Sequence, residues 1–180
     1  FTHWGWSIEK FQLAFVENNG MAFGWALPGS AGKLFLSIFR LIAIIVLGWF
    51  VYAQAKKGAH RGFVICMSMI FAGAVGNMID SAFYGMIFSE SGYQANAVAQ
   101  MFPAQQGYAP FMQGKVVDML HFPLFSGTFP EWFPIWGGES FSFFRPVFNI
   151  ADSAVTCGVF GILIFQKKFF AKKEEEQKAE

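Results

Sequence analysis

The feature that most limits the fold of this chain is a run of twenty residues, 34–53, that contains one charged residue, Arg40. An α-helix rises about 1.5 Å per residue, so a helix over this run spans the roughly 30 Å hydrocarbon core of a bilayer. Two further apolar runs, at 62–84 and 148–166, have their Asn and Asp residues near one end. We therefore predict an all-α membrane bundle with three transmembrane helices.

The composition argues against a soluble protein. Of the 180 residues, 54% are hydrophobic and only 14% are charged, which is less charged surface than a soluble domain of this size needs. The formal net charge of +1 gives no basic face for a nucleic acid. The bilayer is the partner that this composition favours, and the sequence gives no indication of the oligomeric state.

The distribution of Lys and Arg predicts the orientation in the membrane. Eight of the thirteen Lys and Arg residues lie in the segment 54–61 and in the tail 167–180. Positively charged loops face the cytoplasm, so we expect both segments to be cytoplasmic and residues 1–33 and 86–147 to be on the outer side. The polar ends of the second and third helices then meet at the outer face.

The outer segments carry their own structural signals. Residues 11–16 alternate as in a β-strand and are followed by a turn at 17–20, which predicts a small β cradle on the outer surface. Residues 122–148 mix prolines with many aromatic residues, a composition suited to the headgroup region of a membrane. We expect this stretch to lie on the membrane rather than across it, and the charged tail to be a helix or frayed.

Three carboxylates are the candidate functional groups. A carboxylate within or at the edge of a spanning helix costs a few kcal/mol unless it is paired or hydrated. Asp80 and Asp152 each follow an asparagine, Asn77 and Asn149, with the spacing Asn-x-x-Asp, so each amide lies on the same helix face as its carboxylate. Asp118 is the only acid in the apolar stretch 116–122.

Two carboxyl groups that meet in a poorly solvated place share one proton and can activate water for peptide hydrolysis. That chemistry needs no metal, cofactor or covalent intermediate. Two other interpretations stay open: the carboxylates cap helices, or Asp80 pairs with Arg40. A non-catalytic membrane protein that couples protons or cations through these carboxylates is the alternative function, although a relay would place them nearer the midplane.

Other catalytic chemistries lack their residues. His3, His60 and His121 lie in separate segments, so they do not assemble a metal site. Cys66 and Cys157 fall inside predicted spans without paired spacing, which favours packing roles. The glycines of the second and third spans are expected to allow close helix packing. They are Gly73, Gly76, Gly158 and Gly161.

Four motifs in order resemble those of the lipoprotein signal peptidases, also called signal peptidase II. They are Asn18-Asn19-Gly20-Met21-Ala22-Phe23-Gly24, Gly76-Asn77-Met78-Ile79-Asp80, Val116-Val117-Asp118 and Phe148-Asn149-Ile150-Ala151-Asp152. The resemblance extends over about residues 11–166. It implies an intramembrane aspartic endopeptidase of the bacterial inner membrane that removes signal peptides from diacylglyceryl-modified prolipoproteins near the outer face, without a cofactor.

The resemblance also implies residue roles. Asp118 and Asp152 would form the catalytic pair, with Asp80 in support. Asn77 and Asn149 would hold the pair or the substrate backbone, whereas Asn18 and Gly20 would line the cradle. Sequence alone does not distinguish Asp118 from Asp80. Asp152 lies near the start of its helix, where the helix dipole favours negative charge, so we expect it to be the base and Asp118 the initial acid.

The chain departs from the family pattern in three ways. The family usually has an arginine after Gly-Asn-x-x-Asp, where this chain has Ser81, so Arg145 and Arg40 are the candidates to supply that charge. The family usually has a leading helix that is missing here, so we expect three of its four transmembrane helices. The outer stretch 86–147 is longer than in the shorter members and is either a lid, a docking surface or a structural insert.

Overall fold

The computed structural model describes residues 11–19, 29–91, 98–123, 125–143 and 146–177. The chain divides into two compact units, and each is described by itself. The sheet unit comprises Phe1–Asn18 and Val117–Asn149, and the helical unit comprises Asn19–Val116 and Ile150–Glu180.

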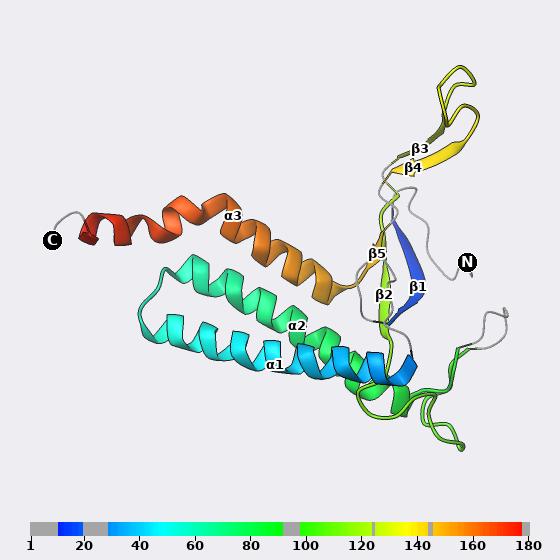
Figure 1. Ribbon diagram of the computed structural model, residues 1–180, viewed down its shortest axis with the longest axis horizontal. Coiled ribbons are helices and arrows are strands. Elements are labelled where there is room, and N and C mark those ends of the chain that lie inside the picture. The colour runs from blue at the N-terminus through cyan, green and yellow to red at the C-terminus, as the bar shows by residue number, and fades with distance from the viewer. Residues whose placement is uncertain (1–10, 20–28, 92–97, 124, 144–145, 178–180) are drawn as a thin grey trace. The chain divides into compact units, whose positions relative to one another are not determined.

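The helical unit contains three long helices, α1 Gly29–Lys56, α2 Arg61–Ile87 and α3 Ile150–Gln177 (Figure 1). Each is long and apolar enough to cross a membrane, which confirms the predicted bundle of three spans. Their outer surfaces are strongly apolar, and the Trp49 side chain on α1 is 69% exposed. The predicted start of the third helix was two residues early, and the charged tail continues that helix through Gln177.

A tight turn joins α1 to α2, which run antiparallel (Figure 1). Gly58 adopts a φ of 68°, which a glycine accommodates without steric cost, and its amide donates to the Ala55 carbonyl at 3.1 Å. His60 then caps α2, since its Nδ1 accepts a hydrogen bond from the Gly62 amide at 3.1 Å. The turn therefore satisfies backbone groups at both helix ends.

Glycines bring α2 and α3 into close contact. An added Cβ at Gly73 would collide with the Ala151 carbonyl oxygen, and one at Gly158 would lie 2.5 Å from the Cys66 carbonyl oxygen. An added Cβ at Gly161 would lie 2.6 Å from the Cys66 sulfur. The prediction that these glycines allow close helix packing is confirmed, and it explains why Cys66 behaves as a small packing residue.

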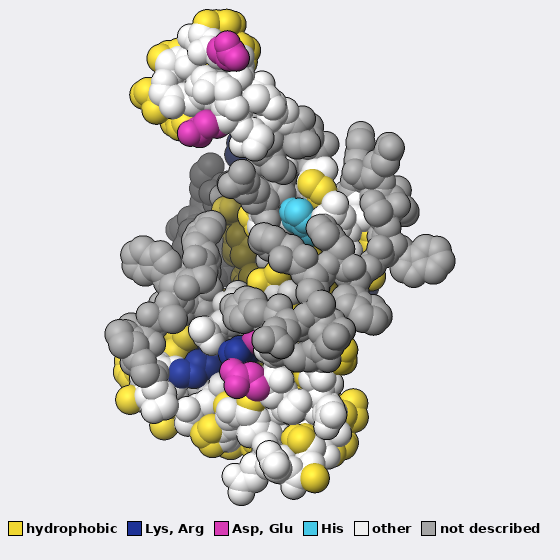
Figure 2. All heavy atoms as spheres, turned by 90° about the vertical axis from the view of Figure 1, so that its right-hand side faces the viewer, with side chains coloured by type: hydrophobic (Ala, Val, Ile, Leu, Met, Phe, Trp, Pro, Cys, Tyr) yellow, Lys and Arg dark blue, Asp and Glu magenta, His cyan; other side chains and the backbone are white. Residues whose placement is uncertain are grey.

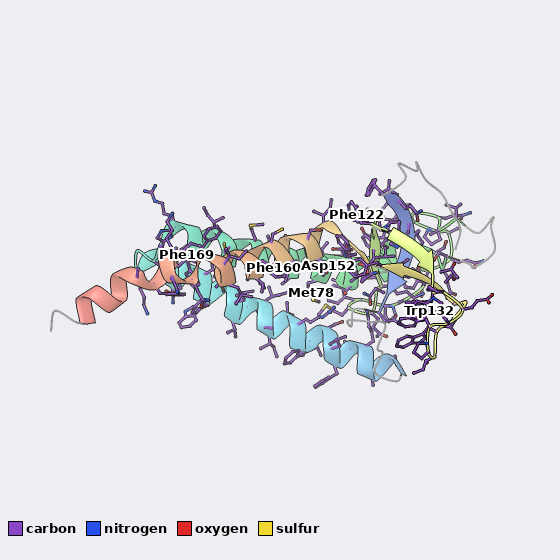
Figure 3. All side chains as sticks on the ribbon, turned by 90° about the horizontal axis from the view of Figure 1, so that it is seen from above. Met78, Phe122, Trp132, Asp152, Phe160 and Phe169 are labelled. Atoms are coloured by element: carbon purple, nitrogen blue, oxygen red, sulfur yellow. The ribbon has the colours of Figure 1, made fainter. Side chains whose placement is uncertain are left out.

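Phenylalanine rings pack the helices together near the α1–α2 turn. The Phe63 ring on α2 makes edge contacts with Phe169 and Phe170 of α3, at centroid distances of 6.3 and 5.3 Å. It also meets the Phe50 ring of α1 at 6.5 Å. Figure 3 shows Phe169 far along α3 from Asp152, which lies near the N-terminal end of the helix.

The loop that follows α2 folds back over the last turns of that helix. The carbonyls of Tyr84, Gly85 and Ile87 accept hydrogen bonds from the amides of Phe88, Ala109 and Phe102, at 3.1, 3.0 and 2.7 Å. The loop is fixed to α1 as well, because the buried Ser37 hydroxyl donates to the Met112 carbonyl at 2.7 Å. Carbonyls that would lack partners at a helix end are thus paired within the chain.

The sheet unit contains a three-stranded sheet in the order β1-β2-β5. Its strands are β1 Gln12–Asn18, β2 Val116–His121 and β5 Val147–Phe148 (Figure 1). Strands β2 and β5 are antiparallel, with Leu120 opposite Phe148. The predicted strand and small sheet are confirmed, but the expected turn at 17–20 was placed too early, because β1 continues through Asn18.

The aromatic segment of the sheet unit forms a second, two-stranded sheet. Strands β3 Phe125–Thr128 and β4 Ser140–Phe143 pair antiparallel, with Thr128 opposite Ser140. Residues 129–139 form the hairpin tip between them. The prolines of this segment flank the strands and lie in the tip, because a proline cannot donate to a β ladder.

Candidate active site

Asp118 is the buried carboxylate of the sheet unit. It lies on β2, where Val116 and Asp118 are buried and Met119 points outward. The Asp118 side chain is only 4% exposed. The apolar stretch around it did not predict which face of the strand it would occupy, because neighbours on both sides are hydrophobic.

Two asparagine amides hold the Asp118 carboxylate. Asn18, the last residue of β1, donates from Nδ2 to Oδ2 at 3.0 Å. Asn149, which follows β5, donates from Nδ2 to Oδ1 at 2.9 Å and is itself only 6% exposed. A buried carboxylate without such donors would be strongly destabilising, so the amides fix both its position and its orientation.

Asp152 is the corresponding carboxylate of the helical unit. It lies in the first turn of α3, as predicted, and is partly buried (Figure 3). Asn77 of α2 donates from Nδ2 to Asp152 Oδ1 at 2.8 Å. The side chain of Arg40 on α1 interacts electrostatically with Asp152. All three helices therefore supply a residue to this cluster.

The two asparagines of the Asn-x-x-Asp motifs act on carboxylates outside their own motifs. Asn77 donates to Asp152, and Asn149 donates to Asp118. The spacing predicted that each amide could donate to its own carboxylate or orient a neighbour. The second of these alternatives is the one that the described contacts show.

Asp80 has a different partner. Its carboxylate forms a side-chain hydrogen bond with the hydroxyl of Tyr84, one helical turn further along α2. Sequence reasoning did not single out Tyr84, although a spacing of four residues places both side chains on one helix face. Arg40, suggested from the sequence as an ion-pair partner of Asp80, interacts electrostatically with Asp152, and its pairing with Asp80 stays a prediction.

Ser81 stands where the family usually has an arginine, and its surroundings explain the small side chain. It is 0% exposed, and its Oγ has no hydrogen-bond partner among the described residues. The Gly114 amide donates to the Ser81 carbonyl at 2.8 Å, so the loop passes directly over this part of α2. A long arginine side chain would have to displace that loop.

Two expected site residues, Gly20 and Arg145, lie outside the described residues. Of the other expected residues, the contacts unite Asn18, Asn149 and Asp118 in one cluster and Asn77 and Asp152 in another. Within the described parts of the chain, no group of three or more His, Cys, Asp or Glu side chains is placed to hold a metal ion. What the site offers chemically is two carboxylates, each fixed by amide donors.

Comparison with known proteins places this arrangement in a family. The family model for signal peptidase (SPase) II matches residues 2–168. A lipoprotein signal peptidase of Porphyromonas gingivalis is 51% identical over 158 residues, which cover 86% of this chain and 66% of the relative. That of Amoebophilus asiaticus is 35% identical over 159 residues, which cover 88% and 61%. The chain thus spans somewhat less than two thirds of the length of these relatives.

A solved structure shares the fold as well. A bacterial membrane enzyme determined by the in meso method superposes with a TM-score of 0.51 at 25% sequence identity, covering 90% of this chain and 68% of that one. The match to the family model extends over all three helices as far as Lys168 and includes Asp118 and Asp152. The chain is a membrane protein that belongs to the signal peptidase II family.

Proposed function

We propose that this protein removes signal peptides from diacylglyceryl-modified prolipoproteins, with Asp118 and Asp152 as an aspartic pair that activates water. The observation that carries the proposal is that both carboxylates are held by asparagine side chains from the family-like motifs. The site would lie near the outer face of the bacterial inner membrane, at the end of the spans opposite the Lys-rich segments.

Chain connectivity supports a meeting of the two carboxylates. Asn149 contacts Asp118 and is only three residues before Asp152 in the sequence. Three residues extend over about 10 Å at most, so the contact between Asn149 and Asp118 limits how far apart the two carboxylates can be. Two carboxylates that activate water must be close enough for one water molecule to contact both. The short stretch of chain between Asn149 and Asp152 favours such a separation.

The proposed reaction proceeds without an acyl-enzyme. Asp152 takes a proton from water, and the water oxygen attacks the scissile carbonyl carbon to give a tetrahedral intermediate. Protonated Asp118 then gives its proton to the departing amide nitrogen as the C–N bond breaks. The pair ends with the proton on Asp152, and exchange with water restores the starting state.

The surrounding residues would position this chemistry. Asn77 holds Asp152 from α2, and Arg40 brings a positive charge close to it from α1. We propose that Arg40 supplies the charge for which the family usually uses an arginine at the position of Ser81. Asn18 holds Asp118 from the end of β1 and, with Gly20, would line the cradle for the substrate peptide.

The test is cleavage of a lipidated peptide by the detergent-solubilised protein. Asp118→Asn and Asp152→Asn should each abolish cleavage while the protein keeps its fold, because asparagine preserves shape but cannot carry the proton. Glu90→Gln, at an exposed position after α2, is the control that changes one carboxylate without loss of activity. Near-full activity of Asp118→Asn would show that Asp118 is not a member of the catalytic pair, and Asp80 would become the candidate partner of Asp152.

A further inference from the structure

The tip of the β3–β4 hairpin exposes large apolar side chains. Trp132 is 79% exposed, Ile135 is 87% exposed and Trp136 is 50% exposed. These three lie within five residues of one another, at the end of a hairpin that is not part of either carboxylate cluster. Figure 2 shows hydrophobic side chains gathered along the outer edge of this hairpin, at the top of the view. Exposed apolar groups at such density mark an interaction surface.

The tip is built as a fixed platform. Its backbone closes with hydrogen bonds from Phe129 to the Glu139 carbonyl and from Gly138 to the Phe129 carbonyl, both at 3.0 Å. The Phe133 ring stacks on Phe129 at 5.1 Å and on Trp136, itself one of the exposed side chains, at 6.3 Å. These ring contacts link Trp136 to the backbone-closed base of the tip and limit how its side chain can move.

The most exposed side chain of the tip is carried by a strained backbone position. Ile135 adopts a φ of 78°, a conformation that is sterically unfavourable for a β-branched residue. Gly138 has a φ of 79°, which costs a glycine little. Strain of this kind is about 1–3 kcal/mol and persists where the surrounding structure imposes it, often at a functional surface. The hairpin therefore holds Ile135 in a backbone conformation that isoleucine alone would not favour.

The charges of the hairpin indicate which kind of partner surface its tip can contact. The stretch 119–144 contains two acids, Glu131 and Glu139, and no Lys or Arg. An acidic tip disfavours an acidic partner and an anionic lipid surface. Tryptophan, by contrast, is the residue enriched where the headgroups of a bilayer meet its hydrocarbon core.

We propose that the hairpin tip is a membrane anchor, in which Trp132, Ile135 and Trp136 insert into the headgroup region of the bilayer that the chain's own helices cross. The chain length permits this contact. Six residues, 144–149, separate Phe143 at the end of β4 from Ile150 at the start of α3. The seven steps from Phe143 to Ile150 extend over about 25 Å at most, so the base of the hairpin is tethered near one end of a membrane-spanning helix. Apolar side chains drive this insertion, so it does not require anionic lipid.

Spin labelling of the whole chain in phosphatidylcholine vesicles tests the anchor. In a background of Cys66→Ala and Cys157→Ala, one label is placed at Ile135→Cys and a control label at Thr128→Cys, an exposed polar position at the base of the tip. The label at 135 should be relaxed more by oxygen, which partitions into lipid, than by a water-soluble nickel chelate. The label at 128 should show the opposite order.

A second pair of variants separates insertion from folding. Trp132→Ser with Trp136→Ser should shift the label at 135 toward the aqueous chelate, whereas Trp49→Ser, which removes an exposed tryptophan from α1, should leave it in place. Adding phosphatidylglycerol should not deepen the label. Equal chelate accessibility at 135 and 128, an unchanged depth in the double variant, or spin–spin broadening between copies of the chain would each overturn the proposal.

Discussion

Asn149 donates a hydrogen bond to Asp118 at 2.9 Å, and both side chains are almost completely buried, at 6% and 4% exposure. The amide lies directly before α3, whereas the carboxylate lies on β2. The contact therefore fixes the catalytic candidate of the strand to the segment that leads into the third helix. It makes Asn149 a positioning residue with a measurable energetic role.

Replacing Asn149 by alanine should lower both stability and activity. One carboxylate oxygen of Asp118 would lose its donor, and a buried polar group without a partner costs about 1–3 kcal/mol. Thermal unfolding in detergent should show the loss of stability, and cleavage of a lipidated peptide should show a lower kcat. Asn18→Ala removes the other donor, so the double variant measures how strongly the two amides are coupled through one carboxylate. Wild-type kcat and stability in both single variants would contradict this role.

Asn77 and Arg40 should affect activity through Asp152. Asn77→Ala removes the donor at 2.8 Å, and Arg40→Gln removes the positive charge that acts on the same carboxylate. We expect each variant to reduce kcat more than KM, because both act on the proposed base and not on a group that binds the substrate. Arg40→Lys retains the charge and should restore part of the activity. Equal loss of activity in Arg40→Gln and Arg40→Lys would show that the charge of the arginine is not what matters.

Helix packing gives a matched pair of glycine variants. At Gly73 an added methyl group would meet the Ala151 backbone and lie 2.7 Å from a Val155 methyl carbon, so Gly73→Ala must push α3 away. Overpacking of this kind costs about 1–3 kcal/mol. At Gly48 the three nearest atoms all belong to the Phe71 ring, the first at 2.9 Å, and a side chain can rotate away. Gly73→Ala should therefore lower the unfolding temperature, and the activity that depends on Asp152, more than Gly48→Ala does.

Ser81→Ala should stabilise the protein. The Ser81 hydroxyl is fully buried without a partner among the described residues, and burial of an unsatisfied hydroxyl costs about 1–3 kcal/mol. The alanine variant should unfold at a higher temperature and remain active. Ser81→Arg, the residue usual in the family, should instead unfold at a lower temperature because the loop at Gly114 blocks its path. A less stable alanine variant would mean that the hydroxyl has a partner that the described residues do not include.

The helices could be predicted from the sequence because hydrocarbon thickness imposes both length and apolar composition. The apolar run 34–53, with Arg40 as its one charged residue, is sufficient to place α1. The Asn-x-x-Asp spacing correctly places Asn77 and Asp80 together on α2. Helix ends were less predictable. The start of α3 moved from 148 to Ile150, because Val147 and Phe148 pair in a β-strand instead.

The partners of the polar residues could not be predicted, because they depend on contacts between distant segments. Asn77 and Asp152 are 75 residues apart in the sequence, and Asn18 and Asp118 are 100 apart. Local spacing indicated only which side chains share a helix face, and for Asn149 that prediction was wrong, because α3 begins after it, at Ile150. The β3–β4 hairpin was equally hidden, since its aromatic and proline content indicated a membrane surface but not a pair of strands.

The folding of the loop over the end of α2 has a consequence for the lipid environment. Because the Gly85 and Ile87 carbonyls are already paired with Ala109 and Phe102, they do not depend on water for hydrogen bonding. Unpaired carbonyls would be costly where the helix leaves the hydrocarbon, and pairing within the chain removes that cost for these two groups.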